Sequence, residues 1–312
     1  MDMSHCQIRA PRPIFIVGAP RSGTSIMNWA IGQHPNIQPM PETVWISTYV
    51  MGAFTSFQKG SEREKFSHLS NVGFPFERFM QQVALSIDAI VHDVFEERCQ
   101  TLYGDYHSRG IRINPENPNA AFQIRRSPED PKLRWIDGTP LNTQFAWALA
   151  QVFPEARFIH NLRNPVDVAL SLENFDRVGA ESQEMEEGLN TWMYHTENAW
   201  RLEQALGPDR VFRLDFGRIE AEPQALLRDV LAFLGEQFSA DCLKPLRHRT
   251  NSSETEDKRD SFLNRFKCGR LTEEVDALYQ ALGQPISPEA REESARILAD
   301  RFYAHLAERP LL

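Results

Sequence analysis

Short apolar runs alternate with longer amphipathic stretches along this chain. The apolar runs have the length and the flanking Gly, Pro, Asp or Asn residues that are typical of buried strands. They are Ile14 to Val17, Leu133 to Ile136, Arg157 to Leu162 and Val211 to Leu214. Three of them precede helical patterns, which are Ser25 to Gln33, Asn142 to Phe153 and Val166 to Glu173. The alternation predicts an α/β fold, with a parallel sheet flanked by helices and ligands bound at the carboxyl ends of the strands.

The pattern changes between Thr43 and Pro131. Apolar residues recur at helical spacing from Phe79 to Val94 and predict one long amphipathic helix in this segment. A second long helix is predicted over residues 186–206, and loops are predicted over the charged segment 58–66 and the proline-rich segment 113–132. We therefore expect a single domain over residues 1–312, with a largely helical insertion over about 43–131 and a helical C-terminal region.

Composition limits the classes of function. The chain has 312 residues, of which 41% are hydrophobic and 25% charged, so it can bury a large core. Its formal net charge of −9 argues against general binding of nucleic acid. The four cysteines are far apart and are expected to be reduced. No stretch approaches the roughly 18 apolar residues of a membrane span, and we expect a cytoplasmic protein without one.

The segment after the first strand favours an anion. Gly18 to Ser25 follows the phosphate-loop spacing G-x-x-x-x-G-K-[ST], but Thr24 stands in place of the lysine and Arg21 is the only cation. Gly23 and the helix N-terminus expose backbone N–H groups, to which Arg21, Ser22, Thr24 and Ser25 add donors. A tight turn capped by Ser25 is the alternative. Because the lysine is missing, a single 5′-phosphate group suits this loop better than a triphosphate with magnesium.

A second candidate site follows the strand that ends at Leu162. Asn164 and Pro165 predict a helix start that needs no ligand. They leave Arg163 unexplained, and a guanidinium group is well suited to bidentate phosphate binding. Ser171 lies eight residues further on. Two anion sites at two strand ends predict a nucleotide that carries phosphates at both its 5′ and 3′ positions.

Both segments resemble motifs of the sulfotransferases that use 3′-phosphoadenosine 5′-phosphosulfate (PAPS). "FIVGAPRSGTSIM" resembles the 5′-phosphosulfate loop in its arginine variant, and "FIHNLRNPVDVALSL" resembles the 3′-phosphate motif, with Arg163 and Ser171 at matching positions. The resemblance implies a P-loop-like fold, PAPS as donor, the bisphosphate PAP as product and no metal. It implies an acceptor hydroxyl on a small molecule, sugar, lipid or tyrosine, and leaves open whether the protein is a homodimer.

The resemblance also implies catalytic residues. In "HPNIQPMPETVWI", Glu42 matches a glutamate that contacts the acceptor hydroxyl, although a helix-capping glutamate is the alternative. Asp137, at the end of its own strand, is a second candidate for the base, and Arg21 is expected to neutralise the leaving group. Many relatives carry a lysine where this chain has Gly138. Either Arg21 acts alone, or a late cation reaches in, from among Arg249, Lys258 and Arg259.

Two other functions remain open. A P-loop kinase of a small hydroxylated metabolite keeps the loop but has neither its lysine nor a clear magnesium aspartate. A non-catalytic nucleotide-binding module is favoured by the missing lysine at Gly138.

Overall fold

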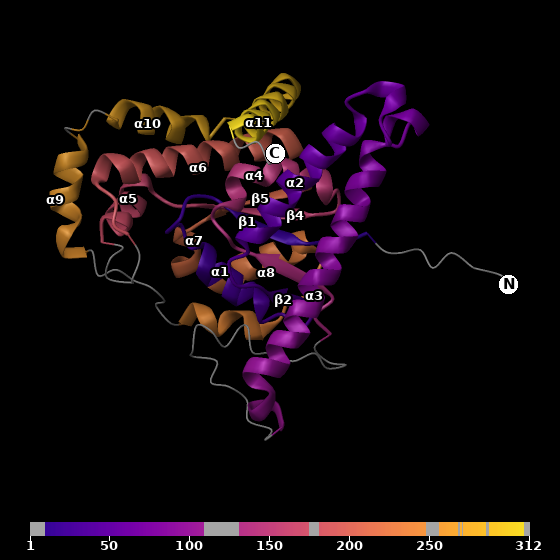
Figure 1. Ribbon diagram of the computed structural model, residues 1–312. Coiled ribbons are helices and arrows are strands. Elements are labelled where there is room, and N and C mark those ends of the chain that lie inside the picture. The colour runs from indigo at the N-terminus through magenta and orange to yellow at the C-terminus, as the bar shows by residue number, and fades with distance from the viewer. Residues whose placement is uncertain are drawn as a thin grey trace.

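A computed structural model describes most of the chain (Figure 1). The described residues are 10–108, 131–174, 181–247, 256–267, 269, 271–284 and 287–308, and the side chains of 102–108 and 256–258 are not among them. Cys6, Cys268, Arg249 and nearly all of the predicted proline-rich loop lie outside the described residues, as does the side chain of Lys258.

A five-stranded parallel sheet forms the centre of the molecule. Its strands are β1 Ile14–Val17, β2 Ile37–Pro39, β3 Arg134–Asp137, β4 Arg157–Leu162 and β5 Val211–Asp215. They lie in the order β2-β3-β1-β4-β5, and every neighbouring pair is parallel. The predicted α/β fold is thus confirmed, with four strands found within one residue of their predicted ends. The sequence missed β2, because a three-residue edge strand that ends in proline has almost no pattern of its own.

Eleven α-helices of the described residues surround the sheet. They are α1 Thr24–Gly32, α2 Val44–Ser61, α3 Phe76–Ser108, α4 Asn142–Val152, α5 Pro165–Glu173, α6 Met185–Leu206, α7 Gly217–Ala221, α8 Pro223–Leu234, α9 Glu256–Lys267, α10 Thr272–Ala281 and α11 Pro288–Glu308. The predicted long helices are α3 and α6, and the C-terminal region is helical as expected. The loop predicted over 58–66 was partly wrong, because α2 continues through Ser61 and a 3₁₀ turn covers Glu64–Phe66.

Alternation along β1 divides the core into two layers. Phe15 and Val17 face one side, where they join a cluster with residues of α2, α3, α4, α6 and α11. Ile14 and Ile16 face the other side and pack with α1 and α8. In Figure 1 the long helix α3 passes along one side of the sheet, while α9 and α10 lie at the opposite side. Because both faces of the sheet are covered, its strands read as continuous apolar runs.

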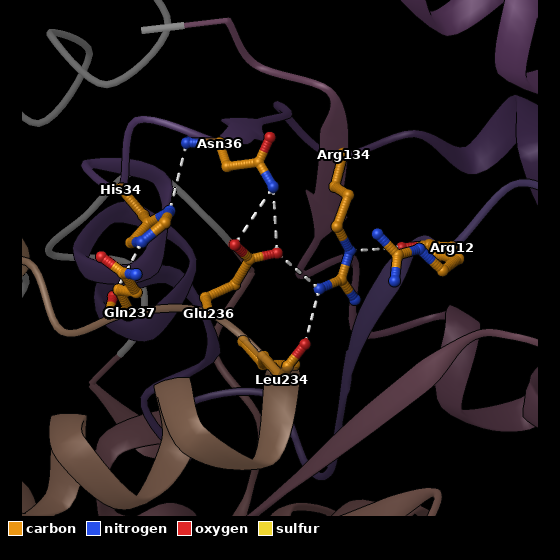
Figure 2. A network of polar contacts seen from close by, with 7 residues as sticks. All are labelled: Arg12, His34, Asn36, Arg134, Leu234, Glu236 and Gln237. Atoms are coloured by element: carbon orange, nitrogen blue, oxygen red, sulfur yellow. Dashed lines mark hydrogen bonds and ion pairs between the residues drawn. The ribbon is translucent and has the colours of Figure 1, made fainter. Parts of the chain in front are cut away.

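A buried ion pair lies at the amino ends of the strands (Figure 2). Nη1 of Arg134, at the start of β3, lies 2.9 Å from Glu236 Oε1 and donates to the carbonyl oxygen of Leu234 over 2.8 Å. Asn36 Nδ2 donates to both oxygens of Glu236 at 3.1 Å. Burial lowers the pKa of Arg134, and Glu236 partly offsets this. The network joins the end of α8 to β3 at the edge away from the carboxyl ends of the strands.

No helix in the described ranges combines the length and the apolar character needed to cross a membrane.

Candidate functional site

The loop that joins β1 to α1 lies directly against neighbouring strand ends. Gly18, Arg21 and Gly23 have positive φ angles of 136°, 66° and 92°. A Cβ atom on Gly18 would lie 2.4 Å from the carbonyl oxygen of Asn161 in β4, and one on Gly23 would lie 2.8 Å from the ring of Phe216 after β5. The two glycines therefore permit both the backbone conformation and the close approach.

The N-terminus of α1 opens from this loop. Gly23 is the N-cap and no side chain caps the helix, so the predicted alternative of a Ser25 cap is not formed. The first backbone hydrogen bond of the helix is donated by Met27 N to Gly23 O at 3.1 Å. The N–H groups of residues 24–26 come before it and have no carbonyl partner one turn earlier. Such an N-terminus stabilises an anion through its N–H groups and the helix dipole.

The hydroxyl groups of the loop differ in their surroundings. Ser22 is buried, and its Oγ donates to the carbonyl oxygen of Ala19 over 2.6 Å, so this hydroxyl shapes the loop. Thr24 is also buried, whereas Ser25 is exposed. Of the three hydroxyls predicted to bind phosphate, Ser25 is the one open to solvent.

The two predicted anion motifs meet in space. Arg21 Nε donates to Ser171 Oγ over 2.9 Å, and Arg163 Nη1 donates to the carbonyl oxygen of Arg21 over 2.8 Å. Burial lowers the pKa of both guanidinium groups, and the charge of Arg163 lowers that of Arg21 further. An anion bound between two guanidinium groups this close would offset their mutual repulsion. Since β1 and β4 are neighbours, the motifs form one cradle, which we call the arginine cradle and define as Arg21, Arg163 and Ser171.

Arg163 is held from several sides. Its guanidinium carbon lies 4.3 Å from the centre of the Phe216 ring, and Trp192 Nε1 donates to its carbonyl oxygen over 3.0 Å. The predicted helix start is confirmed, because Asn164 accepts a hydrogen bond from Val166 N and caps α5. Buried Arg163 Nε has no hydrogen-bond partner among the described residues.

Glu42 and Asp137 lie in contrasting surroundings at the end of β3. Glu42 is exposed and comes directly before Thr43, the residue that precedes α2. Asp137 is fully buried and accepts hydrogen bonds from Thr43 Oγ1, from the N–H and the hydroxyl of Thr139, and from Asn142 Nδ2 at 2.7 Å. A carboxylate surrounded in this way is not placed to take a proton from an acceptor molecule. This burial weighs against Asp137 as the base, and Glu42 is the candidate that solvent can reach.

The first turn of α4 connects these groups to the loop. Thr143 Oγ1 accepts from Gly18 N over 3.0 Å and donates to Gly18 O over 3.1 Å. The preceding residue, Asn142, donates to Asp137. Adjacent side chains thus fix the start of the loop and the end of β3, and they bring Glu42 to the same edge of the sheet as the arginine cradle.

Comparison with known proteins identifies the family. The family model described as "Sulfotransferase family" matches residues 13–240, more than two thirds of the chain. The chain belongs to the sulfotransferase family. An uncharacterized protein of Aquifex aeolicus (strain VF5) is 26% identical over 231 residues, which cover 71% of this chain and 25% of that protein. This sulfotransferase-family chain thus spans about a quarter of the length of that curated relative.

Solved sulfotransferase structures resemble the chain over most of its length. The sulfotransferase domain of the Synechococcus PCC 7002 olefin synthase has 18% sequence identity and a TM-score of 0.48, with 95% of this chain and 96% of that domain covered. A sulfotransferase from Alicyclobacillus acidocaldarius has 18% identity and a TM-score of 0.39, with 96% and 97% covered.

The position of the expected sulfotransferase lysine is closely packed. A Cβ atom on Gly138 would lie 3.1 Å from Asn28 Cβ and 3.3 Å from the carbonyl oxygen of Thr24. Of the cations suggested as substitutes, Arg259 forms an ion pair with Asp167 on α5, with Nε and Oδ1 3.0 Å apart. Arg21 is the suggested cation that the structure places in the loop itself.

Sequence reasoning missed four residues of this sulfotransferase-family site. They are Thr139, Asn142, Thr143 and Phe216. The first three belong to the polar segment "GTPLNT", which directly precedes the buried helix α4 and whose polar character was a usable signal. Phe216 gave no signal, since an aromatic residue after a strand is most often part of the core.

Proposed function

We propose that this chain transfers a sulfuryl group from PAPS to an acceptor hydroxyl. The observation that carries the proposal is the arginine cradle, in which two segments that resemble the family's 5′ and 3′ motifs touch through Arg21 Nε and Ser171 Oγ. Membership of the sulfotransferase family supports a transferase activity.

The residues present suit a nucleotide with two phosphate groups. The N-terminus of α1, with Ser25 and Arg21, would hold the 5′-phosphosulfate, because unpaired N–H groups and a cation converge there. Arg163 and Ser171 would hold the 3′-phosphate. Repulsion between the guanidinium groups of Arg21 and Arg163 supports this assignment, since an anion between them would restore favourable electrostatics.

Glu42 would act on the acceptor. Its carboxylate takes the proton of the acceptor hydroxyl while the acceptor oxygen forms a bond to sulfur, which is general-base catalysis. The bond from sulfur to the bridging oxygen of the 5′-phosphate breaks, and that oxygen keeps the electron pair. Arg21 and the N–H groups of α1 stabilise the negative charge that collects there. Arg163 and Ser171 fix the donor's orientation.

The surroundings of Asp137 weigh against the kinase alternative. A magnesium-dependent phosphoryl transferase needs an acidic ligand beside its phosphate loop. Asp137 ends the strand next to β1, but each of its oxygens already accepts two hydrogen bonds. The loop also has Thr24 where the kinase motif has lysine.

Trp45 is the aromatic residue best placed to meet an acceptor. Phe54 and Trp192 are buried in the core, and Phe57 packs against other rings. Trp45 is 37% exposed and lies three residues after Glu42, on the first turn of α2. A ring there would stack on a sugar or an aromatic acceptor. The acceptor class itself stays open among small molecules, sugars, lipids and tyrosine.

A ligand panel tests the proposal. Thermal unfolding is followed with PAP in the presence of a chelator, and separately with ATP and magnesium. We expect PAP alone to raise the midpoint, because a ligand that binds only the folded state stabilises it. Stabilisation by magnesium-ATP alone would favour the kinase. An unfolding midpoint that neither nucleotide changes would overturn the proposal. Mass spectrometry of candidate acceptors incubated with protein and PAPS then tests the transfer itself.

A further inference from the structure

A closed polar network fixes the segment that carries Glu42. Thr43 Oγ1 donates to Asp137 Oδ2, and Thr43 N donates to Thr139 Oγ1 over 2.7 Å. The hydroxyl of Thr139 donates in turn to Asp137 Oδ1. Thr43 is therefore held to the end of β3 through both its backbone and its side chain, one residue away from Glu42.

The network extends to the first turns of two helices. Asn142 of α4 donates from Nδ2 to Asp137 and accepts at Oδ1 from Ser47 Oγ of α2 over 2.7 Å. These side chains are almost entirely buried: Thr43, Ser47, Asp137, Thr139 and Asn142 are each exposed by 4% or less. In such surroundings every hydrogen bond is strong, and an unpaired group is costly.

The groups around Asp137 suit an ionised carboxylate. The donors that surround it are a backbone N–H, an amide NH₂ and two hydroxyls, all of them neutral. Asn142 presents its NH₂ group to Asp137, and its oxygen accepts from Ser47. Four donors match the acceptors of an ionised carboxylate, although burial raises the pKa of Asp137.

We propose that Asp137 is a positioning residue for Glu42, which it holds in place through Thr43 and on which its buried charge acts. This inference rests on the proposed function, in which Glu42 is the base. It also gives a role to a carboxylate at a point that is sealed from solvent, where a neutral side chain could fill the space.

Asp137 also acts on Glu42 through its charge. The pKa of Glu42 is raised above its ordinary value, mainly because the protein partly shields the carboxylate from water and in addition because of the charge of Asp137. Asp137 is the charged group that acts on Glu42 in the described part of the chain. Removing this charge should lower the pKa of Glu42, whereas a purely structural contribution of Asp137 would leave it unchanged.

The test separates anchoring from charge with two variants. Asp137→Asn removes the charge and keeps the shape, and Thr43→Val removes the anchoring hydroxyl and keeps the charge. Ser47→Ala is the matched control, since it also deletes one buried hydrogen bond of the network but touches neither Asp137 nor Thr43. If Asp137→Asn does not fold, the exchange Asp137→Asn with Asn142→Asp restores matched donors and acceptors and moves the charge within the network.

The first measurement needs no substrate. The side-chain carboxyl carbon of Glu42 is labelled with ¹³C, assigned by its loss in Glu42→Gln and titrated by NMR. We expect a lower pKa in Asp137→Asn and an unchanged one in Ser47→Ala, and hydrogen exchange over residues 40–46 should rise in Thr43→Val. An unaltered pKa in Asp137→Asn, or unaltered exchange in Thr43→Val, overturns the inference.

The second measurement links the network to the reaction. In single-turnover transfer from PAPS, the acid-side midpoint of the pH–rate profile should move to lower pH in Asp137→Asn, while PAP affinity stays near that of the unmodified protein. A rate loss with an unmoved midpoint would overturn the inference. If no transfer occurs in any variant but the titration shifts as expected, the proposed function fails and the coupling of Asp137 to Glu42 stands.

Discussion

Arg21 Nε lies 2.9 Å from Ser171 Oγ, although 150 positions separate the two residues along the chain. The contact exists because β1 and β4 are adjacent parallel strands, so that the loops after them share one edge of the sheet. Arg21 belongs to the segment assigned to the 5′ group and Ser171 to the segment assigned to the 3′-phosphate. A ligand that engages both therefore meets a single connected surface, and a change in either residue is expected to affect the other.

Arg163→Ala should weaken binding of PAP much more than binding of 5′-AMP. A hydrogen bond to a charged group contributes about 1.5–3 kcal/mol, so each one lost costs roughly ten- to a hundredfold in affinity. Isothermal titration calorimetry with both nucleotides measures the difference. Arg265→Ala, which breaks a partly exposed ion pair between α9 and Glu173 of α5, is the control and should leave both affinities unchanged. Equal losses for the two nucleotides would show that Arg163 does not bind the 3′-phosphate.

Gly23→Ala should impair nucleotide binding through the shape of the loop. The new methyl group would lie 2.8 Å from the Phe216 ring, on a residue whose φ of 92° already disfavours alanine. Phe216 also stacks against Arg163, so its displacement disturbs the arginine cradle as well. We expect PAP affinity to fall by roughly tenfold or more, equivalent to about 1.4 kcal/mol.

Gly73→Ala provides the control for backbone strain alone. Its φ is 60°, and a Cβ there has no heavy atom within 4 Å. It should cost about 1–2 kcal/mol of stability and leave PAP affinity as it was. If Gly23→Ala binds PAP as well as Gly73→Ala does, the packing of the loop against Phe216 does not matter for the ligand.

Glu42→Gln should lower transfer by about a hundredfold or more without weakening PAP binding, because glutamine keeps the shape but cannot accept the proton. Glu42→Asp retracts the carboxylate by one methylene and should be intermediate. The rate is measured in single turnovers with an acceptor found by mass spectrometry. Glu62→Gln, an exposed glutamate paired with Lys59, should be as active as the unmodified protein. Near-normal transfer by Glu42→Gln would remove Glu42 from the mechanism.

Glu236→Ala should destabilise the fold and leave the site intact. It takes the counter-ion from Arg134, whose side chain is 4% exposed, and breaking a buried pair costs about 3–5 kcal/mol. Urea unfolding measures the change, and PAP affinity of the folded protein should stay the same because the network lies at the amino ends of the strands. Glu62→Ala, at the surface, should cost no more than about 1 kcal/mol. A similar small loss for Glu236→Ala would mean that solvent reaches Arg134.

His195 should make stability fall as the solution becomes acidic. Burial lowers its pKa to about 4, against 6.5 for an exposed imidazole, so the folded protein holds it neutral. The contribution of neutral His195 to the free energy of unfolding is complete above pH 6.5. It is lost as the pH falls toward 4, because over this range only the unfolded chain takes up the proton. Between pH 7 and pH 5 the loss should be about 2 kcal/mol. Urea unfolding of His195→Gln should show a flatter pH dependence, and an equal slope in both proteins would show that His195 is protonated in the fold.

The sequence by itself determined the layers of the fold and the residue types of the two motifs proposed to bind phosphate. Continuous apolar runs followed by amphipathic stretches have few solutions other than a covered parallel sheet, and Asn164 with Pro165 defined the start of α5 through local hydrogen bonding alone. Gly18 and Gly23 marked a turn that other residues cannot adopt. These features depend on neighbours within a few positions, which is why they can be predicted from pattern.

Only the tertiary structure decided that Asp137 is sealed from solvent. On the sequence it is a carboxylate at a strand end, equivalent to Glu42 as a candidate base. Its burial depends on Thr43, which lies 94 positions away, and on the packing of α4 over the same strand end. Whether a polar group faces solvent or a closed network is set by contacts that no local pattern encodes. The same holds for the contact of Arg21 with Ser171, which exists only because the sheet places β1 beside β4.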